Sequence, residues 1–324
     1  MPTAQFAETY ALVADIGGTN TRVGLAKGDR LLSETVRKFR NAEFADLDTV
    51  LRTFLSGQNG VDCSGACVAV AGPVRDGIGE LTNLNWTMDD ATLARATGAG
   101  TVSILNDLQA QGHALHKIPA ANLRRIIAPR SHGADAPSLV IGVGTGFNVA
   151  PVYPVGDGRL VTPSETGHTS MPVRDDADFR LHTYLEKTHG TPAVEDVLSG
   201  RGLERIYAWL CHESGQETQA QAAEIFAAFE AGTDPVATKT ARMFTRLLGT
   251  IAGDMALIHL PFAGIYLAGG VARAFAPHLN DLGFREAFHD KGRFADFMDN
   301  FAVASIEDDF AALSGCASYL AKLG

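Results

Sequence analysis

The sequence predicts an α/β fold made of two similar halves. Strand-like runs rich in Val and Ile, bounded by Gly, Pro or Asn, alternate with helical patterns along the chain. The segment LVADIGGTNTRVGLA from Leu12 also resembles LVIGVGTGFNVAPVY from Leu139, since both read as apolar strand, Gly/Thr turn and apolar strand. At 324 residues the chain exceeds what most single cores support. We therefore expect a duplicated α/β domain with a cleft between the copies. Two unrelated glycine hairpins are the alternative explanation.

The expected strands are short and apolar, at Ala11–Asp15, Thr21–Ala26, Cys67–Ala71, Val102–Leu105, Leu139–Val143, Val149–Tyr153 and Gly264–Ala268. Two helices stand out. RGLERIYAWL places apolar residues on one face, namely Leu203, Ile206, Tyr207 and Leu210. The segment from Thr233 to Leu260 opens with Asp234 as N-cap and Pro235 at the first helical position.

The bulk properties exclude several classes of protein. A net charge of -10 argues against nucleic acid as the main partner. The most apolar later run, ALIHLPFAGIYLAGGVA, is broken by His, Pro and Gly, so no membrane span is expected. No Lys or Arg precedes Arg22, which argues against a signal peptide. The four cysteines are scattered and indicate reduced thiols in a cytoplasmic protein. Cys63 and Cys67 would share one face of a strand, as buried thiols and not as half of a metal site.

The two glycine turns are candidates for phosphate binding. Backbone N–H groups in a turn without side chains can approach an anion closely, although tight hairpins also use glycine for conformation alone. Asp15 precedes the first turn. A carboxylate next to a phosphate-binding turn is stabilised if a Mg²⁺ ion lies between it and the phosphates of a nucleotide. Thr19 and Thr145 could offer hydroxyls to the phosphates. The alternative is that Asp15 forms the turn by accepting from the Gly17 and Gly18 N–H groups.

A second acid, Asp107, lies where the strand of TVSILNDLQAQGHAL becomes a helix. The carboxyl ends of strands face the ligand crevice in α/β sheets, so Asp107 is a candidate base for phosphoryl transfer. With an ordinary pKa near 4 it would be ionised at pH 7. A simple helix cap is the alternative.

Polar groups suited to a polyol follow in two later stretches. TPSETGHTS carries Glu165 and His168 in a loop, and AVEDVLSGRGL carries Glu195 just before a helix. Carboxylates accept from sugar hydroxyls and imidazole donates to them, so these three residues together could bind a sugar.

Taken together, these segments resemble the bacterial glucokinase family of the actin-like and hexokinase-like phosphotransferases. DIGGTNTR is similar to its first phosphate motif, LNDL to its catalytic Asn-Asp, GVGTGFNVA to its second phosphate motif and ETGH to its sugar loop. VEDVLSG is similar to its third sugar carboxylate and IYLAGGVA to its adenosine motif, while LTNLNW and FHDKGRF are also similar to the family. The matches run in family order from about residue 10 to residue 294. This resemblance favours the functional roles over the helix-cap and turn alternatives.

The resemblance implies duplicated actin-like (ribonuclease H-like) domains around an interdomain active-site cleft. A small domain would span residues 1–117 plus 309–324, and a large one residues 118–308. The implied activity is transfer of the γ-phosphoryl group of MgATP to the 6-hydroxyl of D-glucose, by a cytoplasmic homodimer. Asp107 would be the base, Asp15 would hold Mg²⁺ through water, and the glucose ligands would be Asn106, Glu165, His168 and Glu195. The nucleotide would contact Asp15, Gly17, Gly18, Thr19, Asn20, Gly144, Thr145, Gly146, Gly269 and Gly270.

Three residues depart from the family pattern near the sugar. Ser164 and Thr166 replace glycines of the sugar loop, and Asn148 stands where glycine is common. The bulk of Ser164 and Thr166 beside Glu165 is expected to shift the loop, which leaves the fine hexose selectivity open. A kinase for another hexose or an amino sugar is therefore an alternative, as is a non-catalytic sugar- and ATP-binding sensor.

Overall fold

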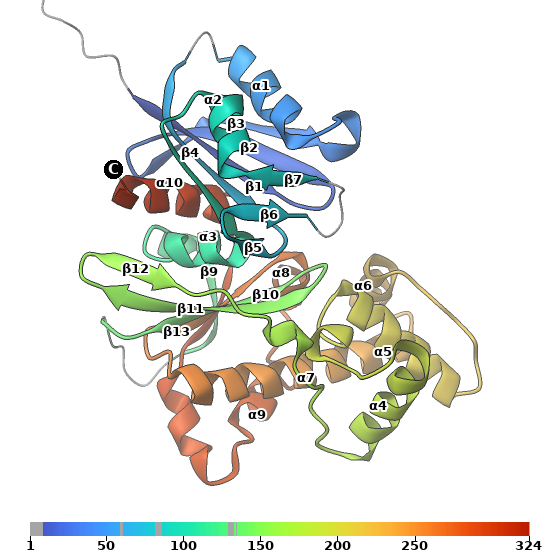
Figure 1. The fold of residues 1–324 in the computed structure, drawn as a ribbon. Helices are drawn as coiled ribbons and strands as arrows, with labels where there is room; N and C mark the ends of the chain where they lie inside the picture. The colour runs from blue at the N-terminus through green and yellow to red at the C-terminus, as the bar shows by residue number, and fades with distance from the viewer. Residues whose placement is uncertain (1–8, 59–60, 82–85, 129–132, 134, 324) are drawn as a thin grey trace, which may run out of the picture. The chain divides into compact units, whose positions relative to one another are not determined.

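The computed structural model describes residues 9–323 apart from 59–60, 82–85, 129–132 and 134 (Figure 1). Contacts divide the chain into two compact units. Unit 1 combines Met1–Pro119 with Asp308–Gly324, and unit 2 is Ala120–Glu307. Among the described helices, none has an apolar stretch long enough to cross a bilayer.

Unit 1 is built on a five-stranded sheet of order β3-β2-β1-β4-β8. Its strands are β1 (Tyr10–Ile16), β2 (Asn20–Lys27), β3 (Arg30–Arg40), β4 (Cys63–Val70) and β8 (Thr101–Asn106). The first three are antiparallel neighbours, and β4 and β8 run parallel to β1. A small second sheet contains β5 (Val74–Arg75), β6 (Ile78–Glu80) and β7 (Thr87–Asp89).

Helices cover both faces of the unit 1 sheet. The apolar cluster on one face includes residues of α1 (Leu47–Ser56) and α2 (Asp90–Thr97). The cluster on the other face includes residues of α3 (Asp107–Ala114) and α10 (Ala311–Leu323). A 3₁₀ turn, η1 (Asn41–Glu43), follows β3. The end of the chain therefore completes the unit that its beginning starts.

The two cysteines of β4 do not share a face of the sheet, so that expectation was wrong. Cys63 packs into the cluster with α1 and α2, whereas Cys67 packs into the cluster with α10. The pairing of β1 with β4 shifts at this point, where Tyr10 pairs with Cys63 but Ala11 with Gly65. The extra residue of such a bulge reverses the alternation of faces. All four cysteines are free and buried, and burial was predicted for Cys63 and Cys67.

Unit 2 repeats the same strand pattern. Its sheet has the order β12-β11-β10-β13-β14-β9. The strands are β9 (Leu123–Ile127), β10 (Ser138–Val143), β11 (Phe147–Val155), β12 (Gly158–Val161), β13 (Gly264–Ala268) and β14 (Val303–Ile306). Again three antiparallel strands are followed by two that run parallel to the first. The duplication predicted from the two hairpins is confirmed in the topology.

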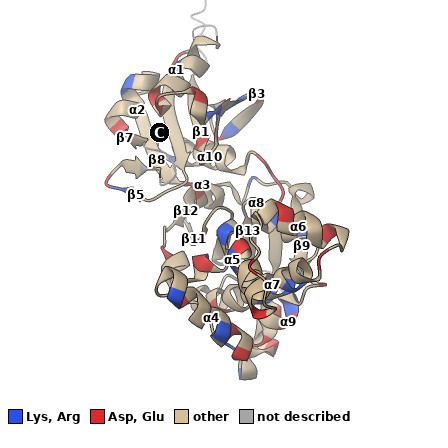
Figure 2. Ribbon diagram, turned by 90° about the vertical axis from the view of Figure 1, so that its right-hand side faces the viewer, with Lys and Arg blue, Asp and Glu red and all other residues tan. Residues whose placement is uncertain are grey.

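The helices of unit 2 are α4 (Asp176–His189), α5 (Gly200–Glu213), α6 (Ala222–Ala231), α7 (Pro235–His259), α8 (Gly270–Phe275) and α9 (Phe284–His289). Its 3₁₀ turns are η2 (Ala120–Asn122), η3 (Thr166–His168), η4 (Val194–Asp196), η5 (Gly292–Phe294) and η6 (Asp296–Asn300). Helix α7 begins as expected, since Asp234 caps it and Pro235 is its first residue. Acidic and basic residues both occur on α4 and α9 (Figure 2).

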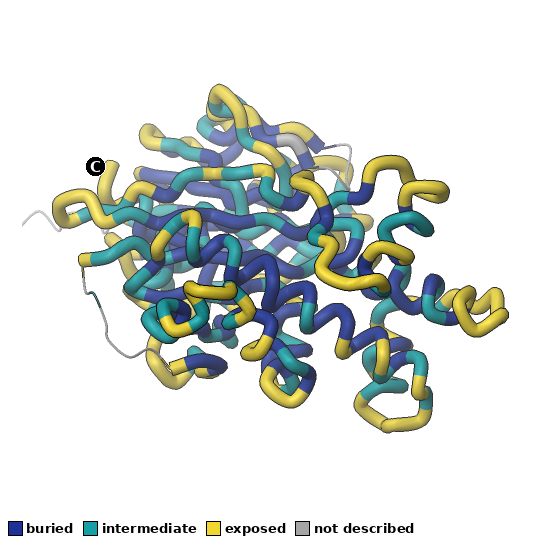
Figure 3. The backbone as a smooth tube through the Cα atoms, turned by 90° about the horizontal axis from the view of Figure 1, so that it is seen from below, coloured by how far each residue is buried: buried dark blue, intermediate teal, exposed yellow. Residues whose placement is uncertain are grey.

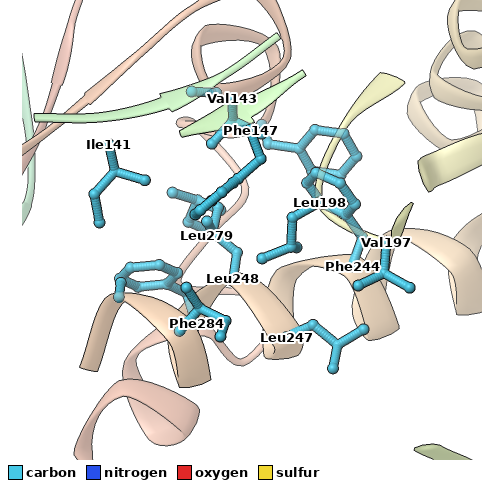
Figure 4. Close-up of a cluster of buried hydrophobic side chains, with 14 of the residues drawn as sticks. Ile141, Val143, Phe147, Val197, Leu198, Phe244, Leu247, Leu248, Leu279 and Phe284 are labelled. Carbon is cyan, nitrogen blue, oxygen red and sulfur yellow. The ribbon is translucent and has the colours of Figure 1, made fainter. Parts of the chain in front are cut away.

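The core of unit 2 joins its sheet to α7. Buried residues run along the inner strands and along much of α7 (Figure 3). Ile141 and Val143 of β10 and Phe147 of β11 lie in one cluster with Phe244 and Leu248 of α7 (Figure 4). Because β10 and β11 are anchored in this way, the turn that connects them is held on a rigid base.

Candidate active site

Two acids lie at the same edge of the unit 1 sheet. Asp15 is near the end of β1, and Asp107 is the first residue of α3, directly after β8. Since β1, β4 and β8 are parallel, their carboxyl ends share one edge. Asp15 pairs across the hairpin with Arg22, whose Nη1 lies 3.4 Å from Asp15 Oδ2. The sequence analysis missed this partner.

The pKa of Asp107 departs from the ordinary value expected from the sequence. Burial, and to a smaller extent the charge of Asp15, together raise this pKa to about 6. The Leu108 N–H, which donates to Asp107 Oδ1 at 2.8 Å, opposes the shift. The pKa of Asp15 is also raised by burial, with Arg22 opposing. The expectation of a pKa near 4 for Asp107 was wrong because the sequence does not show which groups surround the carboxylate.

The first glycine turn connects β1 and β2 through Gly17, Gly18 and Thr19, with Asn20 as the first residue of β2. The Gly17 N–H donates to the Asn20 carbonyl at 3.0 Å. The alternative in which it donates to the Asp15 carboxylate is therefore wrong.

A buried residue that the sequence analysis missed holds this turn. Asn41 is 2% exposed, and its Nδ2 donates to the Gly17 carbonyl at 2.8 Å. Its Oδ1 accepts from the Thr21 hydroxyl at 2.8 Å, and its N–H donates to the Thr19 carbonyl at 3.0 Å. Asn41 follows an exposed strand, and no motif in the sequence marks it.

Asn106 is the residue that caps α3, in a capping box with Gln109. Its Oδ1 accepts from the Leu108 N–H at 3.0 Å, and its Nδ2 donates to the Gly72 carbonyl at 2.9 Å. Asn106 therefore performs the capping that the sequence analysis considered for Asp107.

The second glycine turn connects β10 and β11 through Gly144, Thr145 and Gly146. The Gly144 N–H donates to the Gly146 carbonyl at 2.9 Å, and the Gly144 carbonyl accepts from the Gly200 N–H at 2.8 Å. Within the described chain, no hydrogen bond involves the N–H of Thr145 or, in the first turn, that of Gly18. Unpaired, accessible N–H groups of this kind are suited to an anion.

The three proposed sugar ligands of unit 2 lie around the start of β11. Glu195, in η4, accepts from the Phe147 N–H at 2.9 Å. Glu165 precedes η3, which contains His168, and His168 Nε2 lies 3.9 Å from Glu165 Oε2. The side chains of Glu165 and His168 are 65% and 70% exposed. Unit 2 thus presents two carboxylates and an imidazole beside the second glycine turn.

Gly167 allows this close arrangement. A Cβ at this position would lie 2.1 Å from the Phe147 carbonyl oxygen, which no side chain can tolerate. The loop is therefore pressed directly onto the backbone at the start of β11.

The second Gly-Gly pair follows β13, the parallel neighbour of β10. Gly269 has a φ of 100°, and Gly270 begins α8. A Cβ at Gly269 would lie 2.5 Å from the Val143 carbonyl oxygen, so this pair lies close to the second turn.

The structure thus groups the predicted site residues by unit. Asp15, Asn106, Asp107 and the first turn belong to unit 1, and the others belong to unit 2. Part of the LTNLNW stretch, residues 82–85, lies outside the described residues. Among the residues that the structure does describe, no group of three or more His, Cys, Asp or Glu side chains could hold a metal ion.

Two units of ribonuclease H-like topology, each with a glycine turn inside an antiparallel hairpin (β1 to β2 and β10 to β11), define the class of actin-like phosphotransferases. The family model described as Glucokinase matches residues 12–323. The glucokinase of Rhizobium leguminosarum bv. trifolii is 31% identical over 309 residues, which cover 95% of this chain and 90% of the relative. The chain belongs to the glucokinase family.

Solved structures agree with this assignment. The crystal structure of glucokinase from an Antarctic psychrotroph has a TM-score of 0.85 and 30% identity, and the match covers 98% of this chain and all of that one. The glucokinase of Balamuthia mandrillaris, crystallised with glucose, shares the fold with a TM-score of 0.82 at 23% identity, covering 99% and 95%. The predicted family, two-domain actin-like fold and ATP-dependent hexose kinase class are confirmed.

Proposed function

We propose that this protein transfers the γ-phosphoryl group of MgATP to the 6-hydroxyl of D-glucose, with Asp107 as the base. The observation that carries the proposal is the position of Asp107 at the start of α3, half-buried and beside Asp15. A carboxylate with a pKa of about 6 is mostly ionised at pH 7, yet accepts a proton more readily than an ordinary aspartate. The transition state of phosphoryl transfer is loose, so Asp107 chiefly orients the hydroxyl and accepts its proton.

The two glycine turns would hold the phosphates. Gly17, Gly18, Thr19 and Asn20 would contribute from unit 1, and Gly144, Thr145 and Gly146 from unit 2. The unbonded N–H groups of Gly18 and Thr145 support this assignment. Gly269 and Gly270, next to the second turn, would contact the adenosine.

Glucose would be bound by Asn106, Glu165, His168 and Glu195. The fixed orientation of Glu195, held by the Phe147 N–H, supports its role as an acceptor for sugar hydroxyls. Because the ligands come from both units, the proposal requires one pair of substrates to contact the two units at once, in an interdomain cleft.

Magnesium fits the acids of unit 1. Asp15 and Asp107 are carboxylates close enough to interact electrostatically, and hard oxygen donors are what this ion prefers. Asp15 would hold the hydrated ion, with phosphate oxygens and water as the other ligands. When bound, the ion would neutralise charge on the phosphates. Replacement of Asp15 by Asn should then raise the Mg²⁺ concentration needed for half-maximal rate.

A coupled assay of MgATP with glucose, mannose, fructose and glucosamine tests the reaction. We expect glucose to have the highest kcat/KM, and Asp107→Ala to lower kcat by about 10² to 10⁴ while ATP binding persists. A higher kcat/KM for another sugar would favour the alternative hexose kinase. Glucose binding by calorimetry without turnover would favour the sensor.

Two further parts of the proposal rest on the family resemblance. The protein would be a homodimer, which analytical ultracentrifugation tests directly. It would act in the cytoplasm, and its four free, buried cysteines suit a reducing compartment. Cell fractionation would decide the location.

A further inference from the structure

The loop that carries Glu165 and His168 is connected by hydrogen bonds to one side chain of β11. Asn148 Oδ1 accepts from the Thr166 N–H at 3.0 Å and lies 3.0 Å from the Ser164 hydroxyl. Asn148 Nδ2 donates to the Ser164 carbonyl, and also to Glu165 Oε2 at 3.3 Å. A single half-buried amide therefore contacts three consecutive residues of the loop.

The orientation of this amide follows from its neighbours. Oδ1 faces groups that carry hydrogens, the Thr166 N–H, the Ser164 hydroxyl and its own neighbouring Val149 N–H. Nδ2 faces a carbonyl and a carboxylate oxygen, which only accept. A flipped amide would place donor against donor and acceptor against acceptor, so the arrangement has one satisfied state.

The Ser164 hydroxyl extends the connection. It lies 2.7 Å from the Val149 carbonyl and 2.9 Å from the Thr166 hydroxyl. With its one proton it can donate to the Val149 carbonyl or to Asn148 Oδ1, while it accepts from the Thr166 hydroxyl. Asn148, Ser164 and Thr166 are the three positions that depart from the family pattern, and they bond to one another. The expectation that their bulk merely displaces the loop overlooks this compensation.

The same strand also holds the other carboxylate. The backbone N–H of Phe147 donates to Glu195, and the side chain of the next residue, Asn148, donates to Glu165. Two consecutive residues of a strand anchored in the core thus orient Glu195 and Glu165, the two carboxylates of unit 2 that are proposed to bind the sugar. Both Glu165 contacts fall on Oε2, and within the described chain Oε1 has no such contact. That oxygen is available to a ligand.

We propose that Asn148 is a positioning residue for sugar binding: with Ser164 and Thr166 it holds the loop in its binding conformation before the sugar arrives. This inference rests on the proposed function, since it assigns Glu165 to the sugar. A loop ordered in advance loses less conformational entropy on binding, so the network should act on sugar affinity. It should leave the affinity for nucleotide unchanged, because Asn148 contacts no residue of the glycine turns through these bonds.

The kinetic test compares Asn148→Ala with wild type. We expect the KM for glucose and the glucose dissociation constant to rise at least about tenfold, with kcat and the KM for MgATP within about twofold. Asn148→Asp should raise the KM for glucose as well, because it places a second negative charge beside Glu165. Asn280→Ala is the matched control, since it removes a side-chain bond to the Ile126 carbonyl in the same unit.

A second measurement tests how well ordered the loop is in the absence of substrate. Hydrogen exchange of the Thr166 amide, followed by NMR in the unliganded protein, should accelerate at least about tenfold in Asn148→Ala and remain unchanged in Asn280→Ala. The double variant Asn148→Ala/Ser164→Ala should be no worse than Asn148→Ala alone if the side chains act as a unit.

The outcomes separate this inference from the proposed function. An unchanged KM for glucose in Asn148→Ala, or a KM for MgATP that rises equally, overturns the positioning role. If wild type does not phosphorylate glucose, the proposed function fails. In that case, an unchanged hydrogen-exchange rate of the Thr166 amide in Asn148→Ala overturns the claim that Asn148 orders the loop. A faster exchange rate supports that claim.

Discussion

Lowering the pH should inactivate this kinase in a range where an ordinary aspartate would not respond. With a pKa of about 6, Asp107 is about nine-tenths ionised at pH 7, half ionised at pH 6 and about one-tenth ionised at pH 5. An aspartate with a pKa of about 3.9 would stay more than nine-tenths ionised at pH 5. If the ionised form is the base, kcat/KM at pH 5 should be about one-tenth of its plateau.

Because nucleotide phosphates also titrate, the assay should include the unliganded protein. The carboxyl ¹³C signal of Asp107, assigned by its loss in Asp107→Asn, should titrate with a midpoint near 6. In Asp15→Asn this midpoint should fall, since a neighbouring negative charge is removed, but not to 3.9, because burial is the larger cause. A midpoint below about 4.5 in wild type, or no fall in Asp15→Asn, would refute the reasoning.

The same shift has a consequence for stability. The pKa of Asp107 is higher in the folded protein than in the unfolded chain, so the folded protein binds more protons between about pH 4 and pH 6. The contribution of Asp107 to stability therefore declines as the pH rises through this window. Asp107→Asn should accordingly raise the Tm at pH 7, and this gain should vanish near pH 4. A lower Tm at pH 7 would contradict this account.

Three other variants test particular contacts. Asn41→Ala removes two side-chain bonds that hold the first glycine turn and, at about 1 kcal/mol per bond, should raise the KM for MgATP about thirtyfold without changing the KM for glucose. Gly167→Ala introduces a Cβ 2.1 Å from a carbonyl oxygen and should raise the KM for glucose, whereas Gly100→Ala, whose Cβ has only an ordinary contact, should not. Asp178→Ala leaves Arg246 without its buried partner and should lower the free energy of unfolding, measured with urea, by about 3 kcal/mol. A decrease of less than about 1 kcal/mol would contradict this expectation.

Local signals predicted the inner strands and the helix starts correctly. The hairpin strands on either side of each glycine turn and the Asp234 cap of α7 follow from nearest-neighbour preferences. The edge strand β3 was missed because it is largely exposed and carries charged residues, so it has no clear apolar alternation. In α5 the buried face includes Trp209, while Leu210 is only partly buried.

The sequence by itself determined the class of protein and predicted the candidate reactive groups, because glycine turns, carboxylates and their order along the chain can be read directly from the residues. Only the tertiary structure decided what surrounds those groups. The Arg22 partner of Asp15, the buried Asn41 and the Asn148 network depend on how strands and loops pair, and the raised pKa of Asp107 depends on burial in the folded unit. Burial and hydrogen bonding depend on which segments meet in space, and no local pattern records that.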